Sequence, residues 1–187
     1  MNSEQSLFDN SGLDANPLNE FSGCHQHIIA NFKRLRTLLD LLRQGEDSPE
    51  VKGLARRLLL FFQEVVLEHH AEEEQELFVA VMDCADKGEE ADEGRRAIRR
   101  LVAEHRELEA VWQCLEPAIK RLSRGKRADL DLELAEDLAS RYLAHAAYEE
   151  QYFLPLAARI LSKSEMSALG LTLHMRHQDE DSVGNYI

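Results

Sequence analysis

Two histidines and several glutamates are concentrated in the segment LEHHAEEEQELFVAVM (residues 67–82), whose apolar residues otherwise have the spacing of a buried helix. His69 and Glu73 lie four residues apart, and residues at that spacing share one face of an α-helix. His145 and Glu149 repeat this spacing in the segment HAAYEEQYFLP. Imidazole and carboxylate groups together suit iron, manganese or zinc. The pattern therefore indicates either a metal site or a buried hydrogen-bond network.

The rest of the chain contains the elements that would position these groups. Apolar residues recur at steps of three and four in four stretches, about 21–42, 58–80, 98–115 and 134–156. Turn signals separate the stretches at Gly45 with EDSPE, at Lys87–Gly88 and at Gly125. This pattern predicts an all-α protein, an up-down-up-down antiparallel four-helix bundle over residues 19–162. We expect a loosely ordered polar arm over residues 1–18 and, within residues 163–187, a short helix (about 165–174) and a tail.

Each predicted helix places one histidine on its inward face, and these are His25, His69, His105 and His145. In an antiparallel hairpin, two residues lie level when they are equally far from the turn. The midpoints between successive histidines are residues 47, 87 and 125, and each falls on a predicted turn. We therefore expect the four imidazoles to lie at one level of the bundle, together with the two glutamates. Burying such polar groups without partners would cost about 1–3 kcal/mol each.

Such a cluster could hold two metal ions. Glu73 and Glu149 would come from diagonally opposed helices and could each bridge two ions, while the four histidines would supply two nitrogens per ion. That arrangement leaves open coordination positions, which iron and oxygen chemistry use. The sequence contains no Glu-x-x-His motif, which disfavours the ferritin-like carboxylate proteins. A helical interaction module with a zinc-filled or metal-free His/Glu core stays open as an alternative.

Several neighbours of these residues have less specific patterns. We interpret His70 as a supporting or surface residue, and His27 as exposed. Glu109 shares the face of His105, so it is a candidate for a further ligand or for a hydrogen-bond acceptor. We interpret Glu72, Glu74 and Glu76 as solvating the helix. We interpret Tyr142, Tyr148 and Tyr152 as packing residues. Either Tyr142 or Tyr152 is also a candidate for a hydrogen bond near the site. Cys24 adjoins His25 and is interpreted as a small buried residue, with a redox thiol as the alternative.

Composition narrows the functional classes. The 187-residue chain carries a formal net charge of −13, which makes nucleic acid and anionic membranes poor partners. Its three cysteines include no Cys-x-x-Cys pair, which argues against a disulfide scaffold and a thiolate zinc site. We recognise no signal peptide and no apolar run of about 18 residues, so we expect a cytoplasmic protein. A homodimer or another protein partner stays open.

The segments CHQHI, HHAEEEQELF, AEHRELE and HAAYEEQYFLP together resemble the bacterial hemerythrin-like (HHE cation-binding) domain over about residues 20–160. The resemblance implies a four-helix bundle around a non-haem di-iron centre with carboxylate bridges, and an oxo or hydroxo group between the irons. Carried over position by position, the implied metal ligands are His25, His69, Glu73, His105, His145 and Glu149. Zinc or manganese would also suit this donor set.

The resemblance also implies a class of function. It favours a metal- and gas-binding protein over an enzyme, with dioxygen, nitric oxide or peroxide as the ligand, or a role in handling iron. The worm oxygen carriers have a second histidine on the third helix, where this chain has Glu109, which argues against reversible oxygen transport. The four-histidine, two-glutamate set looks more like the iron-centre repair proteins, so iron–sulfur cluster repair or iron donation is the alternative. Those proteins often carry an N-terminal cysteine segment, and residues 1–20 contain no cysteine.

Overall fold

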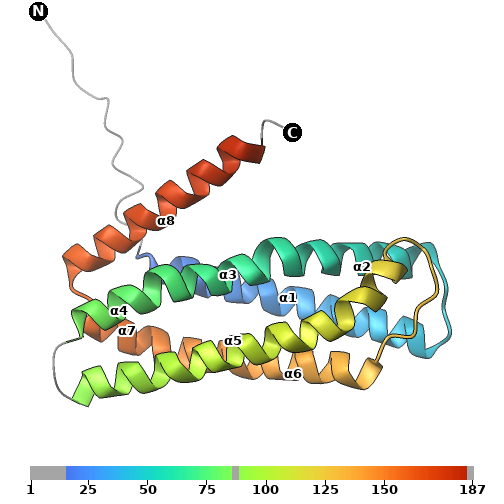
Figure 1. The fold of residues 1–187 in the computed structure, drawn as a ribbon, viewed down its shortest axis with the longest axis horizontal. Coiled ribbons are helices and arrows are strands. Elements are labelled where there is room, and N and C mark those ends of the chain that lie inside the picture. Colours follow the sequence, from blue (N-terminus) through green and yellow to red (C-terminus); the bar gives the residue numbers. More distant parts are fainter. Residues whose placement is uncertain (1–15, 86–88, 185–187) are drawn as a thin grey trace, which may run out of the picture.

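The computed structural model describes residues 16–85 and 89–184, and it consists of long helical rods (Figure 1). The first and third rods are α1 (Leu18–Arg43) and α5 (Glu89–Leu122). The second rod is continuous through α2 (Pro49–Phe61), η1 (Phe62–Val66), α3 (Leu67–Glu72), η2 (Glu73–Leu77) and α4 (Phe78–Cys84). The fourth is continuous through α6 (Leu132–Tyr148), η3 (Glu149–Phe153) and α7 (Leu154–Ile160), and α8 (Lys163–Gly184) follows it. The segments labelled η are single π-helical turns.

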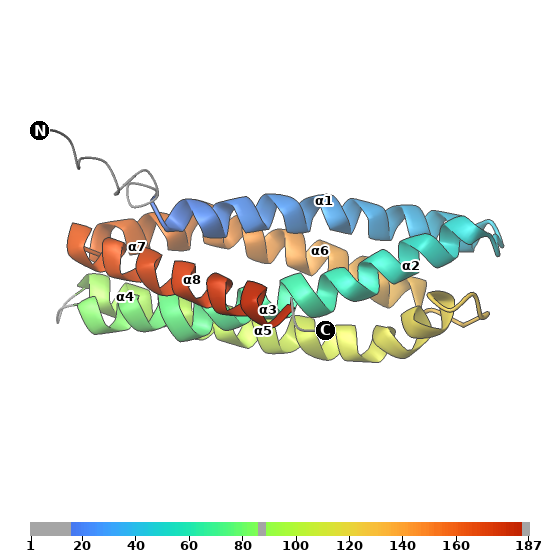
Figure 2. The ribbon, with the colours of Figure 1, turned by 90° about the horizontal axis from the view of Figure 1, so that it is seen from above.

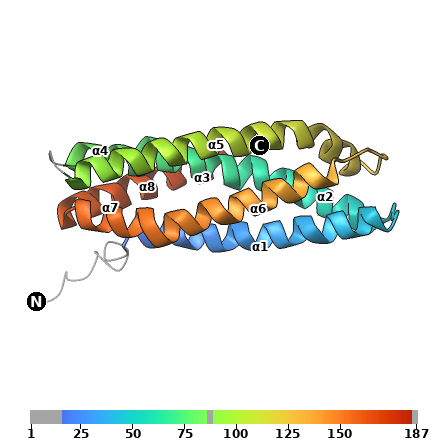
Figure 3. The ribbon, with the colours of Figure 1, turned by 90° about the horizontal axis from the view of Figure 1, so that it is seen from below.

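The four long rods form the predicted antiparallel bundle. The second rod packs against α1 and α5, and α6 packs against α5 and α1 (Figures 2 and 3). The second rod therefore lies diagonally opposite the fourth, and α1 lies diagonally opposite α5. No strand occurs in the described parts of the chain. No helix among the described residues is long and apolar enough to cross a membrane.

Local signals end the helices where the sequence predicts turns. Gly45 and Gly125 follow α1 and α5 with φ values of 75° and 67°, a conformation that glycine adopts without strain. Ser48 caps α2 by accepting a hydrogen bond from the Val51 amide, and Asp131 caps α6 in the same way. The predicted turn at Lys87–Gly88 and most of the predicted N-terminal arm lie outside the described residues.

Two apolar halves fill the bundle, and a polar layer separates them. The polar layer contains the candidate metal ligands. A set of four buried apolar or aromatic side chains lies one helical turn away from it on each side. On the side of the α1–α2 turn the set is Ile28, Val66, Leu108 and Tyr142. On the other side it is Phe21, Leu77, Leu101 and Phe153. These side chains shield the polar layer from water along the bundle axis.

The C-terminal helix is longer than predicted, because α8 runs from Lys163 to Gly184 rather than from 165 to 174. Leu169 and Leu173 are buried and belong to the second apolar half, so α8 covers part of the bundle near η2. Its other apolar residues do not form a continuous stripe, and the sequence pattern therefore gave no signal beyond His174.

Candidate metal centre

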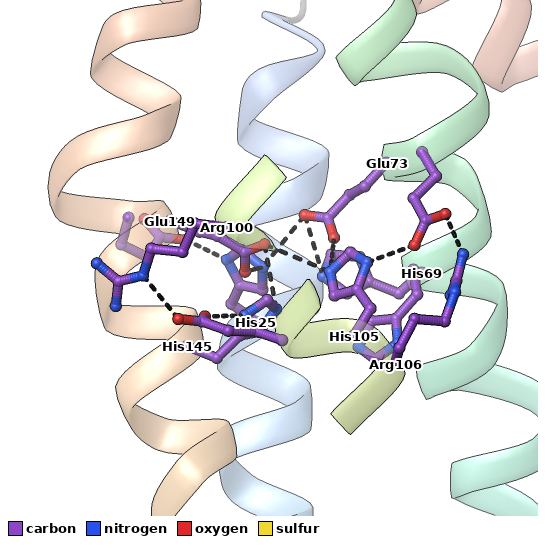
Figure 4. Close-up of polar contacts among 12 residues, drawn as sticks. His25, His69, Glu73, Arg100, His105, Arg106, His145 and Glu149 are labelled. Carbon is purple, nitrogen blue, oxygen red and sulfur yellow. Dashed lines mark hydrogen bonds and ion pairs between the residues drawn. The ribbon is translucent and has the colours of Figure 1, made fainter. Parts of the chain in front are cut away.

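Six side chains converge in the polar layer, and they come from all four rods (Figure 4). Each is at most 2% exposed, which places ionisable groups in the most buried part of the bundle. They are the residues that the sequence brought forward, namely His25, His69, Glu73, His105, His145 and Glu149. The four histidines thus lie at one level of the bundle, as expected.

The six residues form two overlapping groups of four. In one group, His25 and His69 lie with Glu73 and Glu149, and all four ligand atoms are within 4.8 Å of one another. In the other, His105 and His145 lie with the same two glutamates at the same spacing. Both carboxylates are therefore shared between two pairs of imidazoles.

The two oxygens of Glu73 face different imidazoles. Oε1 lies 3.5 Å from His69 Nε2 and 3.7 Å from His25 Nε2. Oε2 lies 3.3 Å from His105 Nε2, on the other side of the site. One carboxylate thus reaches both imidazole pairs with separate oxygens.

Glu149 divides its oxygens in the same manner. Oε2 lies 3.0 Å from His25 Nε2, whereas Oε1 lies 3.2 Å from His145 Nε2 and 3.8 Å from His105 Nε2. Two donors bound side by side to one ion at about 2.1 Å stand about 3.0 Å apart, so these separations suit shared coordination. Each carboxylate is therefore shared, through separate oxygens, between the two pairs of imidazoles.

The inward atoms of the site lie at ion-pair distances from one another, but none makes an aligned hydrogen bond with the described residues. These atoms are the Nε2 atoms of His25, His69, His105 and His145 and both carboxylate oxygens of Glu73 and Glu149. Each buried polar atom without a hydrogen bond destabilises the fold by about 1–3 kcal/mol, so this cluster destabilises the protein when nothing is bound to it. Cations would satisfy all of these atoms at once, and the donor set therefore fits metal ions.

A second ring of carboxylates orients three of the imidazoles. His25 Nδ1 lies 2.7 Å from Glu150, His105 Nδ1 lies 2.8 Å from Glu74, and His145 Nδ1 lies 2.9 Å from Glu104. An ionised carboxylate only accepts hydrogen bonds, so each Nδ1 donates. When such an imidazole is neutral, its Nε2 lone pair therefore points into the site.

Arginine side chains at the surface contact two of these outer glutamates, and Ser22 donates a hydrogen bond to the third, Glu150. Arg106 donates a hydrogen bond to Glu74, and Arg100 donates one to Glu104 at 2.6 Å (Figure 4). Glu74 was interpreted as solvating its helix, and that interpretation was wrong. Its role depends on a contact with the neighbouring helix, which the pattern of its own helix does not indicate because Glu74 lies off the inward stripe.

An approximate two-fold relation connects the second rod to the fourth and α1 to α5. The Glu-Glu-Gln runs at 73–75 and 149–151 occupy equivalent places, and Glu74 and Glu150 each bind the histidine of an adjacent helix. Glu73 and Glu149 each begin a π-helical turn, a feature that is frequent at functional sites. We expected uninterrupted α-helices here, and the pattern of apolar residues did not indicate these turns.

The two-fold relation fails at His69. Glu104 precedes His105 and accepts from His145, but the equivalent residue before His25 is Cys24. His69 Nδ1 accordingly has no hydrogen-bond partner among the described residues. A pocket of about 230 Å³ reaches this side of the site, and Cys24 and His69 both line it.

The charged groups of the site raise the pKa values of some of its histidines and lower those of its two glutamates. Burial by itself would lower the pKa of His25, but Glu149 and Glu73 outweigh it and raise that pKa to about 11. The same two carboxylates overcome burial at His105 and raise its pKa to about 10. Burial would raise the pKa values of Glu73 and Glu149, yet the surrounding imidazoles hold both below their usual range. Burial dominates at His69 and lowers its pKa.

His70 is buried rather than exposed at the surface, at 1% exposure, and its Nδ1 lies 3.1 Å from Glu109. Glu109 was a candidate for a further ligand or for a hydrogen-bond acceptor, and in the structure it accepts from His70. The His70 ring stacks on His105 with centroids 4.0 Å apart and planes 7° apart. A ring nitrogen of His70 comes within 4.8 Å of donors from His105 and His145, but parallel rings cannot both hold one ion in their planes. As oriented, His70 is a neighbour of the cluster.

The other neighbours divide between core and surface. His27 is exposed, as expected, and Tyr142 is fully buried. Tyr152 was predicted to be a packing residue, but it is 40% exposed and its hydroxyl donates to Glu93. The π-helical turn that begins at Glu149 changes the phase of the residues after it, which explains this difference.

The sequence comparisons agree with the geometry. Residues 16–157 match the hemerythrin HHE cation-binding domain. No curated protein matches the chain in sequence. The match covers most of the 187 residues and contains all six converging side chains. The chain, whose buried His/Glu cluster fits cations, therefore belongs to the hemerythrin HHE cation-binding domain family.

Proposed function

We propose that this chain is a non-haem di-iron protein that binds dioxygen, nitric oxide or peroxide and acts in sensing, storage or detoxification. The observation that carries the proposal is the division of the carboxylate oxygens. Glu73 and Glu149 each direct one oxygen toward the His25 half of the site and the other toward the His105 half. The four oxygens lie at ion-pair distances from imidazole nitrogens, but none accepts an aligned hydrogen bond of the kind that a hydrogen-bonded core without ions would require.

The donor count favours ligand binding over a purely structural site. Each ion would receive two imidazole nitrogens and one oxygen from each bridging glutamate, in one of the two groups of four. Four protein donors leave open positions on an iron ion, whereas a structural zinc site is closed by four. When bound, the irons would supply Lewis acidity and a store of electrons.

The protein residues would orient donors and exclude water. Glu74, Glu104 and Glu150 keep a proton on the Nδ1 atoms and direct the opposite nitrogens inward. The apolar sets on both sides of the polar layer keep bulk water from the ligand position. This arrangement suits a small ligand that enters a dry site.

Metal content and visible absorption together test the proposal. Protein purified without an affinity tag from iron-replete cells should contain about two irons per chain and absorb visible light in a manner that changes with dioxygen, nitric oxide or peroxide. A colourless protein containing zinc, or one without metal across such preparations, would refute it in favour of the structural module. Restored activity of a damaged iron–sulfur enzyme on addition of the protein would instead support the repair alternative.

We also propose a cytoplasmic location. The three cysteines, Cys24, Cys84 and Cys114, are all unpaired, which suits a reducing compartment. Fractionation of cells that produce the full chain from its own promoter should recover it with cytosolic markers, and recovery with an oxidising compartment would contradict this location.

A further inference from the structure

The approximate two-fold relation provides an internal comparison for the side of the site that faces the α1–α2 turn. Tyr142 lies three residues before His145, and its counterpart in the second rod is Val66, three residues before His69. His70 directly follows His69, and its counterpart in the fourth rod is Ala146. Both counterparts are fully buried and apolar, so the packing of this layer does not demand polar groups. Tyr142 and His70 are thus two polar exceptions in one apolar layer.

These two exceptions lie next to each other and next to the centre. The Tyr142 ring centroid is 5.8 Å from that of His70 and 5.6 Å from that of His145. The remaining members of the layer, Ile28, Val66 and Leu108, are aliphatic and at most 2% exposed. The two polar side chains therefore lie next to each other and next to His145 of the cluster.

The Tyr142 hydroxyl is fully buried and has no hydrogen-bond partner among the described residues. Buried tyrosine hydroxyls usually find a partner, and phenylalanine would fill the same space without this cost. A phenol is un-ionised at neutral pH, so the oxygen carries a proton. Tyr142 is therefore a hydrogen-bond donor that lacks an acceptor.

His70 presents the complementary group. Its Nδ1 lies against the Glu109 carboxylate and must donate, which leaves a lone pair on Nε2. Nε2 is buried and has no partner among the described residues. The layer thus contains one unused donor and one unused acceptor, on side chains whose ring centroids are 5.8 Å apart.

We propose that Tyr142 and His70 form the polar part of the small-ligand site, and that the ligand they select is a hydroperoxide-like species, which both accepts and donates a hydrogen bond. The Tyr142 hydroxyl donates to an oxygen of the ligand, and His70 Nε2 accepts the ligand's own proton. Dioxygen, nitric oxide and azide can use only the first of these contacts. This inference rests on the proposed di-iron function and adds the ligand class and the residues that recognise it.

The test uses iron-loaded full-length protein and two probes, hydrogen peroxide and azide, whose binding is followed through visible absorption in stopped-flow mixing. Tyr142→Phe should weaken both probes by about 10-fold or more, since a hydrogen bond to a charged group contributes about 1.5–3 kcal/mol. His70→Leu should weaken peroxide but change azide affinity less than about threefold, because azide has no proton to donate. The matched control is Tyr152→Phe, which removes an exposed hydroxyl from the same rod and should change neither affinity.

Two further measurements separate the outcomes. Iron content should be unchanged in Tyr142→Phe, and the thermal midpoint of the metal-free protein should not fall, because the hydroxyl makes no hydrogen bond with the described residues. If that variant retains two irons and binds both probes as the wild type does, the inference is overturned while the proposed function stands. Equal losses of peroxide and azide in His70→Leu would overturn the hydroperoxide assignment. A wild-type protein that holds no iron, or binds neither probe, would overturn the proposed function itself, and the inference with it.

Discussion

Glu73 and Glu149 are equivalent residues of diagonally opposed rods, and each is the first residue of a five-residue π-helical turn. Their carboxylates meet in the middle of the bundle, where each faces imidazoles from both halves of the site. Two like charges at 0% exposure would repel strongly without compensation. The four surrounding imidazoles, and the cations that we propose, supply that compensation.

Replacing either bridging glutamate by glutamine should remove metal from both positions. In Glu73→Gln or Glu149→Gln, each ion loses one of its protein oxygens, because each carboxylate serves both groups of donors. We expect iron to fall from about two ions per chain to fewer than one, measured by elemental analysis. Glu107→Gln is the control, since its carboxylate is 66% exposed and faces Arg141 at the surface. Retention of two irons in either bridging variant would contradict the bridging role.

The outer carboxylates should tune affinity without being required for binding. Glu150→Gln weakens the acceptor that fixes the orientation of His25, and Glu74→Gln does the same for His105. Loss of such partners typically costs about 10–100-fold in metal affinity, and competition with a coloured chelator would measure it. An affinity that is unchanged in both variants would show that the inner residues are held by packing alone.

A reciprocal exchange tests the broken two-fold relation. Glu104→Cys should weaken iron retention, because His145 Nδ1 loses its acceptor. Cys24→Glu should tighten retention by up to about tenfold, because it places a carboxylate beside the unpartnered His69 Nδ1. Dissociation rates into excess chelator would compare the two variants, with Cys24→Ser as the size-matched control. Faster release from Cys24→Glu than from Cys24→Ser would contradict the equivalence of positions 24 and 104.

Metal binding should release protons at neutral pH. Without ions, burial is outweighed by Glu149 and Glu73, which raise the pKa values of His25 to about 11 and of His105 to about 10, so both imidazoles carry a proton at pH 7.5. An ion needs the neutral imidazole, and it must displace these protons. Affinity should therefore rise with pH through the neutral range, with about two or more protons released per pair of ions. Calorimetry in two buffers of different ionisation enthalpy measures this number, and a value of zero would show that the imidazoles are neutral beforehand.

Sequence periodicity could predict the bundle and the convergence of the six residues, because both depend on helical phase and on distances from turns. The midpoints at residues 47, 87 and 125 placed the histidines level without any knowledge of coordinates. The π-helical turns could not be predicted from this periodicity, because apolar residues at steps of three and four indicate a regular α-helix throughout. The roles of Glu74, Glu104 and Glu150 depend on which exposed position of one helix meets the next. For His70 the sequence left a supporting and a surface role open, because its direction lies between the inward and outward faces, and the structure shows a buried position beside His105.

Anomalous X-ray scattering at the iron edge, recorded from crystals of the iron-loaded chain, measures the centre most directly. We expect two peaks, about 3.5–4 Å apart, between Glu73 and Glu149, one beside His25 and His69 and the other beside His105 and His145. A single peak, or peaks outside the space between the two carboxylates, would contradict a di-iron centre bridged by these glutamates.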